Sequence, residues 1–315
     1  MVGFLALAAL AGVIVGYFGH QIFVFDIIAH FRLHMVLLAA GLCAAAAVLF
    51  AWRALWWSLA ALAMGVAGLS PLWEGVAPTT DGTPVTIVTA NLNHQNAAPE
   101  DMRAALLASN ADVLVTQETT KKAQSGVDPL TSHYPFRLAV ATRGSILRTV
   151  IWSKFPMRDG RLLLDDMVGP TGASAVIEVA PGLEIGVLGV HLTRPGQELQ
   201  ERQIAALDRL TAGLPRPMVL LGDLNATPWS AAMRRVESLT GARRVPGYRI
   251  TWTGQYPTPF GPVPAPLGQP IDHILVTEGV GIETIATFEI PGSDHLAVRA
   301  VLRLPDDGSF GLSQR

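Results

Sequence analysis

The first 75 residues hold three long apolar stretches with few charged side chains between them. They cover Val2–Phe18, Met35–Trp52 and Ala54–Trp73, about 17–20 residues each. A helix of that length crosses the roughly 30 Å hydrocarbon core of a bilayer. Tryptophans lie at or near the ends of the last two stretches, where an interfacial aromatic belt places them. The pattern predicts about three transmembrane helices in residues 1–75.

Two other interpretations of this region stay open. The first stretch resembles the apolar part of a cleaved signal peptide, although no Lys or Arg precedes it. A soluble helical bundle would need polar helix faces, which these stretches almost entirely lack. We expect an integral membrane protein, in a bacterial inner membrane. Arg53 between the last two stretches favours a cytoplasmic amino terminus, with the larger domain outside the cytoplasm.

The pattern changes after residues 76–84, which have the Gly, Pro, Thr and Asp content of a linker. In residues 85–315, short alternating or wholly apolar segments predict strands at Val85–Ala90, Asp112–Thr116, Thr149–Ser153, Ala173–Val179, Glu184–Val190, Met218–Leu221, Asp272–Val276, Gly281–Phe288 and Leu296–Leu302. Helical spacing predicts helices at Pro99–Asn110, Gln197–Ala212 and Ser230–Leu239. Strands outnumber helices and many neighbours have hairpin spacing. We therefore expect mixed sheets flanked by helices, not one doubly wound parallel sheet.

One long segment of the predicted domain has neither strand nor helix periodicity. Gly254–Pro270 is rich in Pro and Gly and is predicted to be a loop, whose Tyr256 and Phe260 would line the mouth of a cleft.

Composition narrows the classes of protein to consider. The chain is 50% hydrophobic and 15% charged, against about 25% charged in an average soluble protein. This balance excludes a disordered chain. A net charge of −2 gives no general basic field for holding nucleic acid. The single cysteine, Cys43, excludes a disulfide framework and a thiolate zinc site.

Polar side chains cluster at the ends of the predicted strands, where they would line one cleft. They are Asn91, Asn93, Gln117, Glu118, His191, Asp223, Asn225, Asp272, His273, Asp294 and His295. Carboxylate and amide oxygens suit a hard cation such as Mg²⁺. Histidines with carboxylate partners suit general acid–base catalysis. The nucleophile elbow, the zinc-protease motif and the phosphate-binding loop are all absent from the sequence.

Six ordered segments resemble the endonuclease/exonuclease/phosphatase superfamily, which includes DNase I-like nucleases, neutral sphingomyelinases and inositol polyphosphate 5-phosphatases. They are Thr89–Asn93, Gln117–Thr119, Gly189–Leu192, Gly222–Pro228, Ile271–Ile274 and Ser293–His295. The resemblance covers about residues 84–304 and implies a four-layer α/β (α+β) sandwich of two mixed sheets. The apolar amino terminus resembles membrane-attached bacterial members of that superfamily.

The resemblance also implies roles for individual residues in a Mg²⁺-dependent hydrolysis, with Mn²⁺ as a possible substitute. Glu118 would be the main metal ligand, with help from Asn91 and, more weakly, Asn93. Asp223 would orient or deprotonate the attacking water, and Asn225 would hold a phosphate oxygen. His295 would contact the scissile phosphate, with its tautomer fixed by Asp272 or Asp294. His191 would hydrogen-bond the phosphate or the leaving oxygen.

Structural explanations compete with several of these assignments. Asn91 or Asn93 alone would also fit a turn, and Glu118 alone would fit a helix cap. His191 would also fit a structural histidine, and His273 would fit simple packing beside Asp272. His94, Gln95 and Asn96 are predicted to be loop residues, and His20, His30 and His34 to be interfacial or loop residues.

Two departures from the family pattern bear on the choice of activity. Asn93 stands where some nucleases of the family carry Asp, and His191 stands where abasic-site endonucleases carry Tyr. We expect a membrane-tethered phosphoesterase, with a phospholipid, a phosphorylated small molecule or a nucleic acid as substrate. An inactive membrane scaffold with the same fold is the alternative. No protein partner is evident.

Overall fold

The computed structural model describes residues 1–120, 126–139, 149–165, 169–256, 261, 263–265 and 267–305. Its helices are α1 (Val2–Gly16), α2 (Asp26–His30), α3 (Arg32–Val48), α4 (Trp52–Ala67), α5 (Pro99–Ala108), α7 (Glu198–Ala205), α8 (Leu207–Thr211) and α9 (Ala231–Thr240). Its strands are β1 (Thr83–Asn91), β2 (Val113–Gln117), β3 (Phe136–Leu138), β4 (Thr149–Ser153), β5 (Met157–Asp165), β6 (Gly169–Ala180), β7 (Leu183–His191), β8 (Met218–Asp223), β9 (Arg243–Arg244), β10 (Gln255–Tyr256), β11 (Val263–Pro264), β12 (Asp272–Val276), β13 (Gly281–Glu289) and β14 (Leu296–Leu304).

Two six-stranded mixed sheets form the body of the molecule. One has the order β13-β14-β1-β2-β4-β3 and the other β5-β6-β7-β8-β12-β9. Each sheet contains a parallel pair, β1 with β2 and β7 with β8, next to antiparallel neighbours. Mixed sheets with hairpin connections, as the strand spacing predicts, are therefore confirmed.

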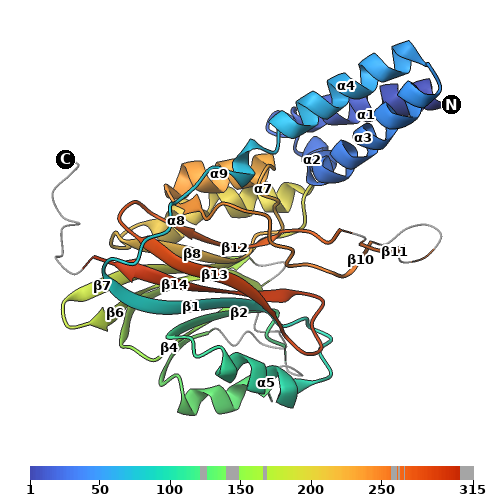
Figure 1. Ribbon diagram of the computed structural model, residues 1–315. Coiled ribbons are helices and arrows are strands. Elements are labelled where there is room, and N and C mark those ends of the chain that lie inside the picture. The colour runs from blue at the N-terminus through green and yellow to red at the C-terminus, as the bar shows by residue number, and fades with distance from the viewer. Residues whose placement is uncertain are drawn as a thin grey trace.

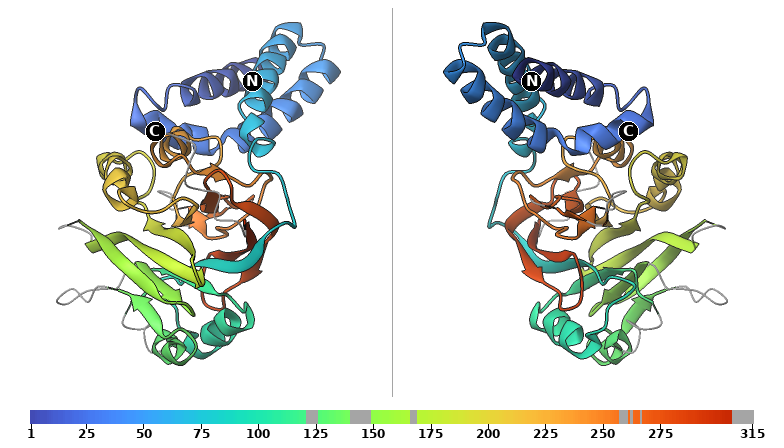
Figure 2. Two further views of the ribbon diagram at one scale, coloured as in Figure 1. Left: turned by 90° about the vertical axis from the view of Figure 1, so that its left-hand side faces the viewer. Right: turned by 90° about the vertical axis from the view of Figure 1, so that its right-hand side faces the viewer.

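The sheets pack face to face and helices cover their outer faces, which makes four layers (Figures 1 and 2). Alternate side chains of both sheets fill the central core, with residues such as Ile87, Val115 and Val187 fully buried. A second core lies between the β5-β6-β7-β8-β12-β9 sheet and helices α7, α8 and α9. A third lies beneath α5, where Met102 and Leu106 pack on Leu114. The predicted sandwich of two mixed sheets flanked by helices is confirmed.

Helices α1, α3 and α4 extend from the sandwich as a separate antiparallel bundle (Figure 1). By length and composition, one helical segment among the described residues is long and apolar enough to cross a membrane, Trp52–Leu72 with 21 residues. Phe23–His30 and Arg32–Val48 would count as a second only as one span bent by 55°. Val2–Gly16 has 15 residues, about 22 Å of helix, which is shorter than the roughly 30 Å apolar layer.

The expectation of about three full-length spans is therefore not supported. The apolar stretches predicted from sequence include end residues that the structure places in turns or loops. Tyr17 ends the first helix, and Leu49 and Phe50 lie in the turn between α3 and α4.

Two predictions about local structure in the sandwich are wrong. The helix predicted at residues 197–212 is two helices, α7 and α8, which meet at Ala206, whose N–H is shared between the carbonyls of Arg202 and Gln203. The segment 254–270 contains the strand pair β10–β11. The side chain of Tyr256, and Phe260 altogether, lie outside the described residues.

Residues 76–84 lie against the sandwich. Val76 N–H donates to Arg244 O at 3.1 Å and Thr79 N–H donates to Ile282 O at 3.0 Å. The last two residues of the predicted linker, Thr83 and Pro84, begin β1.

Candidate active site

The strand directions explain why distant polar residues meet at one end of the sandwich. In the parallel pairs, β1 and β2 end at Asn91 and Gln117, and β7 and β8 end at His191 and Asp223. Strand β12 runs the opposite way, so its first residue, Asp272, pairs with Asp223. His295 directly precedes β14, which is antiparallel to β1. The polar residues at the strand ends of both sheets therefore lie together at one end of the sandwich.

Asn91 lies between two carboxylates that come from different sheets. Its Nδ2 donates to Asp223 Oδ2 at 3.0 Å and to Glu118 Oε1 at 3.3 Å. His191 Nε2 faces the same two groups, 3.6 Å from Asp223 Oδ2 and 3.8 Å from Glu118 Oε1. Asn91 and Asp223 are buried, whereas Glu118 is partly exposed. The acid pair therefore opens to solvent at Glu118.

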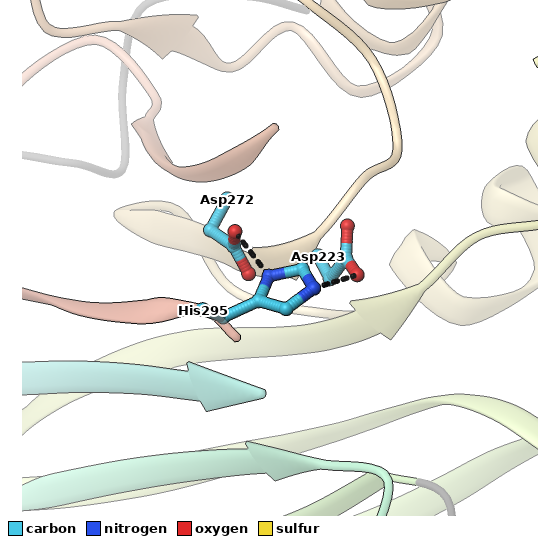
Figure 3. Close-up of side chains that lie close together, drawn as sticks. All are labelled: Asp223, Asp272 and His295. Atoms are coloured by element: carbon cyan, nitrogen blue, oxygen red, sulfur yellow. Dashed lines mark hydrogen bonds and ion pairs between the residues drawn. The ribbon is translucent and has the colours of Figure 1, made fainter. Parts of the chain in front are cut away.

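A second constellation joins Asp223 to His295 and Asp272, as Figure 3 shows. His295 Nδ1 is 2.8 Å from Asp272 Oδ2, and His295 Nε2 is 3.9 Å from Asp223 Oδ2. Since a carboxylate accepts, Nδ1 carries a proton and donates it to Asp272. All three side chains are buried. Each has one potential metal-ligand atom, and these three atoms lie within 4.8 Å of one another. The ring is thus held with Nε2 directed at Asp223.

Burial and neighbouring charges shift the pKa values of these groups in opposite directions. Burial, reinforced by Asp272, raises the pKa of Asp223 despite the nearby His295. Burial acts to lower the pKa of His295, but the Asp272 charge and hydrogen bond outweigh it and raise the pKa. Burial acts to raise the pKa of Glu118, but His191 and the hydrogen bonds from His94 and Asn91 lower it to about 2. Glu118 is therefore a permanent anion at neutral pH.

Asp272 and Asp294, which the sequence left as alternative partners of His295, have separate positions. Asp272 makes the contact to the imidazole. Asp294 accepts from Asn93 Nδ2 at 3.1 Å and from Trp252 Nε1 at 3.0 Å. Asn93 also accepts at Oδ1 from Gln95 N–H, so both ends of its amide are already engaged with protein groups. Asp294 and Asn93 therefore connect the loop after β1 to the loop before β14 by hydrogen bonds.

Several residues outside the predicted set join the site. His94, predicted to be a loop residue, donates to Glu118 Oε2 through its backbone N–H at 2.8 Å, and its Nδ1 lies 2.7 Å from the same oxygen. Ser293 accepts from His295 N–H and donates to Asn91 O at 2.8 Å, which ties the two loops together. In the sequence, the only indication that His94 belongs to the site was its position three residues after Asn91, in the turn after β1.

Asn225 contacts Asp223, whereas His273 contacts the loop that follows Asp223. Asn225 N–H donates to Asp223 Oδ1 at 2.9 Å, and its Nδ2 donates to Leu192 O. His273 Nε2 lies 2.8 Å from Ala226 O, on the opposite face of β12 from Asp272. His273 thus takes the packing role that the sequence left open.

The backbone is strained where the acids emerge from the sheets. Glu118 has φ +53°, a left-handed conformation that is uncommon for this residue type and typical of functional sites. Gly222, just before Asp223, has φ +151°, and a Cβ there would lie 1.9 Å from Val190 O. Only glycine fits between the parallel strands at that point.

The comparison with known families agrees with this geometry. The model of the Endonuclease/Exonuclease/phosphatase family matches residues 88–295, which contain every residue of the site. The chain belongs to this family. Its members hydrolyse phosphate esters, generally with divalent metal ions. No curated protein sequence matches the chain.

Solved structures of the family share the fold. The endonuclease/exonuclease/phosphatase from Bacteroides vulgatus is 19% identical with a TM-score of 0.55, and covers 70% of this chain and 99% of its own. TDP2 from D. rerio, complexed with a single-strand DNA product, is 14% identical with a TM-score of 0.56 and the same coverage. Sphingomyelinase C from Streptomyces griseocarneus is 17% identical with a TM-score of 0.51, again with that coverage. At these identities the likeness shows the fold.

The site's donor atoms fit the divalent metal that the family generally uses. Glu118, Asp223 and Asp272 supply carboxylate oxygens close together, without a Lys or Arg among the contacts described for them here. Within the described part of the chain, Asp272 Oδ1 is buried without a hydrogen-bond partner. Three carboxylates so close together, with histidines as the basic groups among their described contacts, favour a hard cation.

Proposed function

We propose that the chain is a membrane-tethered, metal-dependent phosphoesterase that hydrolyses a phosphodiester or phosphomonoester by attack of water. One observation carries the proposal: Asn91 connects a partly exposed, anionic Glu118 to a buried Asp223, which itself faces His295. This arrangement combines an oxygen ligand, a base and a cation at one end of the family fold.

Glu118 and Asn91 would hold the metal, with Mg²⁺ or Mn²⁺ as the expected ion. Glu118 is better suited than Asp272 because it is partly exposed, and a bound Mg²⁺ usually keeps several waters. Asp272 is already engaged by His295. When bound, the metal would neutralise charge that develops on the phosphoryl oxygens. His94 would keep Glu118 in its orientation, since it contacts the carboxylate twice.

The remaining residues supply proton transfer and charge stabilisation. Asp223, with its raised pKa, would accept the proton of the attacking water. His295, kept protonated beside Asp272, would contact a phosphate oxygen through Nε2. His191 would hydrogen-bond the phosphate or the leaving oxygen, and Asn225 would hold another phosphate oxygen. His295, His191 and Asn225 all contact or face Asp223.

The surface of the amino-terminal bundle supports the membrane tether. Phe4, Phe50 and Trp56 are 76%, 75% and 70% exposed, while Ala39 and Ala61 between the helices are 0% exposed. Small residues at helix contacts and large apolar residues outside are typical of helices in lipid. We place the catalytic domain outside the cytoplasm of a bacterial inner membrane. An alkaline phosphatase fusion at Arg315 should then be active, and activity of a cytoplasmic reporter alone would reverse this topology.

The function is tested with the full chain in detergent micelles. We expect turnover of bis-p-nitrophenyl phosphate, or of another member of a diester and monoester panel, with Mg²⁺ or Mn²⁺ and none in EDTA. Glu118→Gln should remove turnover or raise the metal requirement, while Glu100→Gln, an exposed glutamate on α5, should behave as wild type. Full activity in EDTA contradicts metal dependence, and no turnover under any condition favours the inactive scaffold.

The substrate class is a separate part of the proposal. A net charge of −2 gives the chain no general basic field, and phosphate contacts dominate affinity for duplex nucleic acid. A membrane tether places the enzyme close to phospholipids. We therefore expect phospholipid or lipid-linked phosphate esters in mixed micelles to be better substrates than duplex DNA. A higher kcat/KM for DNA at moderate salt would reverse this order.

A further inference from the structure

The short helix α2 joins the amino-terminal bundle to the active-site end of the sandwich (Figure 1). Asp26, its first residue, is 2% exposed and lies at the start of α9. Its Oδ1 accepts from Ala231 N–H at 2.7 Å, and its Oδ2 accepts from Ala232 N–H at 3.0 Å. Asp26 therefore caps a helix of the catalytic domain from outside that domain.

His30, one turn later on α2, contacts the loop that runs from β8 to α9. Its Nδ1 lies 2.7 Å from Asp26 O, and since a carbonyl only accepts, Nδ1 carries a proton. Its Nε2 lies 3.3 Å from Asn225 O and 3.4 Å from Thr227 N. Nε2 thus lies within reach of both the Asn225 carbonyl and the Thr227 N–H, and the ring is 5% exposed.

The contacted loop carries two residues of the active site. It begins at Asp223, whose Oδ1 accepts from Asn225 N–H at 2.9 Å. Gln200 Nε2, on α7, also donates to Asn225 O, at 3.2 Å. The backbone of Asn225 has φ +47°, a left-handed conformation held by these contacts on both of its sides. A displacement at His30 is therefore transmitted directly to Asn225.

An apolar contact fixes the same junction from the other end of the loop. Trp229 is 1% exposed, its Nε1 donates to Ala29 O at 2.7 Å, and it packs on Val36 and Leu69 of the bundle. The loop of residues 224–229 is thus held at both ends by the amino-terminal segment. Removal of that segment would expose backbone groups that it now satisfies.

We propose that His30 and Asp26 are positioning residues of the active site, which set the geometry of Asn225 and Asp223 from the membrane-side segment. The amino-terminal helices are then a working part of the catalytic site as well as a tether. This inference rests on the proposed function for its kinetic readout, and its structural readout is independent of activity.

The kinetic test compares His30→Leu with His34→Leu in the full chain, with bis-p-nitrophenyl phosphate and Mg²⁺ in detergent micelles. His34 lies on α3, and neither of its ring nitrogens has a hydrogen-bond partner within the described residues. We expect His30→Leu to lower kcat per folded molecule by about 10- to 100-fold, the effect of a displacement near 1 Å. His30→Gln places an amide near the position of Nε2 and should restore most of the rate. His34→Leu should stay close to wild type.

A double-mutant cycle separates positioning from loss of stability. In an Asn225→Ala background, His30→Leu should cost little further activity, because the Asn225 side chain that His30 positions is already absent. Multiplicative losses would overturn the proposal, as would unchanged kcat and KM per folded molecule in His30→Leu. Where His30→Leu gives no folded protein, Asp26→Asn, which keeps the side-chain shape, should lower kcat through the same loop, and a wild-type kcat there would also overturn it.

Hydrogen exchange gives the readout that needs no activity. Peptides spanning residues 224–232 should exchange faster in His30→Leu than in wild type, and at the wild-type rate in His34→Leu. Unchanged exchange in His30→Leu overturns the proposal even if the enzyme is active. If exchange is faster in His30→Leu but the wild-type chain has no turnover, the contact between α2 and the loop is supported and the proposed function fails. Failure of this inference and failure of the proposed function are therefore distinguishable.

Discussion

The amino-terminal bundle and the sandwich use apolar residues in opposite arrangements. In the sandwich the large side chains are inside, and Leu114 and Ile151 are 0% exposed. In the bundle the small side chains are inside, with Ala39 fully buried, and Trp56 is 70% exposed. Both regions are rich in apolar residues, so composition alone does not distinguish the two arrangements.

The difference is what we expect if the sandwich folds in water and, as proposed above, the bundle lies in lipid. In water, burial of large apolar surface is the main favourable contribution to folding, so large residues gather inside the sandwich. In lipid, that contribution is missing between helices, and small residues allow close backbone contact. The candidate catalytic residues Glu118, Asp223 and His295 all lie in the sandwich.

The largest expected effect places catalysis in the sandwich. Asp223→Asn removes proton acceptance at nearly constant shape, so kcat should fall by about 10²–10⁴-fold. Melting temperature should fall only moderately, because the amide can keep one of the two hydrogen bonds that Asp223 accepts from Asn225 and Asn91. Steady-state kinetics with Mg²⁺ measures the change, and Asp128→Asn, an exposed aspartate, is the matched control. Wild-type turnover in Asp223→Asn would remove this residue from the mechanism.

The next effect tests where large side chains matter for stability. Leu114→Ala should lower the free energy of unfolding of the sandwich by about 2–5 kcal/mol, since it leaves a cavity between β2 and α5. Trp56→Ala removes a larger side chain from an exposed position and should change that free energy by less than about 0.5 kcal/mol. Denaturant unfolding of the full chain in micelles compares them. Equal losses would mean that Trp56 packs against protein.

A smaller effect tests the packing of small residues between the helices. Ala39→Leu, in the middle of α3, should destabilise the bundle by about 1–3 kcal/mol through overpacking. Gly41→Leu lies two residues away on the same helix, where an added Cβ meets no atom within 4 Å, so it should be tolerated. Thermal unfolding followed by helical circular dichroism distinguishes the two. A tolerated Ala39→Leu would contradict the close helix contact.

The smallest effect is a pH dependence that belongs to the sandwich. Burial, with the Arg244 charge, lowers the pKa of His273 to about 4 from an ordinary value near 6.5. The unfolded chain therefore binds this proton more readily, so the stabilising contribution is present above pH 6.5 and declines as the pH falls toward 4. His273→Gln keeps a donor for Ala226 O but does not titrate. The stability difference between wild type and variant should shrink from pH 7.5 to pH 5, and a constant difference would contradict the shift.

Local pattern was enough to predict most of the fold. Strands β4 and β12 match their predicted bounds, and β8 and β14 extend only two residues further. Strands β4, β8 and β12 are almost wholly buried, so short apolar segments make them visible in the sequence, and β14 alternates in part. Strands β3, β5 and β9, the strand pair β10–β11 and the break between α7 and α8 were missed. The last two depend on what the segment packs against, and their local residue pattern does not reveal it.

The site residues were predicted through ordered motifs, but their contacts were not. The motifs left Asp272 and Asp294 as alternative partners of His295, and only the antiparallel register of β12 on β8 decided for Asp272. His94 had no motif of its own and became visible only when the turn after β1 folded back on Glu118.

The sequence by itself determined two apolar environments and a set of strand ends that carry acid, amide and imidazole groups. It did so because hydrophobic period and residue type are local properties of the chain. Tertiary structure alone decided that α2 reaches from the bundle to the loop after Asp223, since Asp26 and Ala231 are separated by 205 residues. A contact at that distance depends on how whole layers pack, so the chain shows it only after folding.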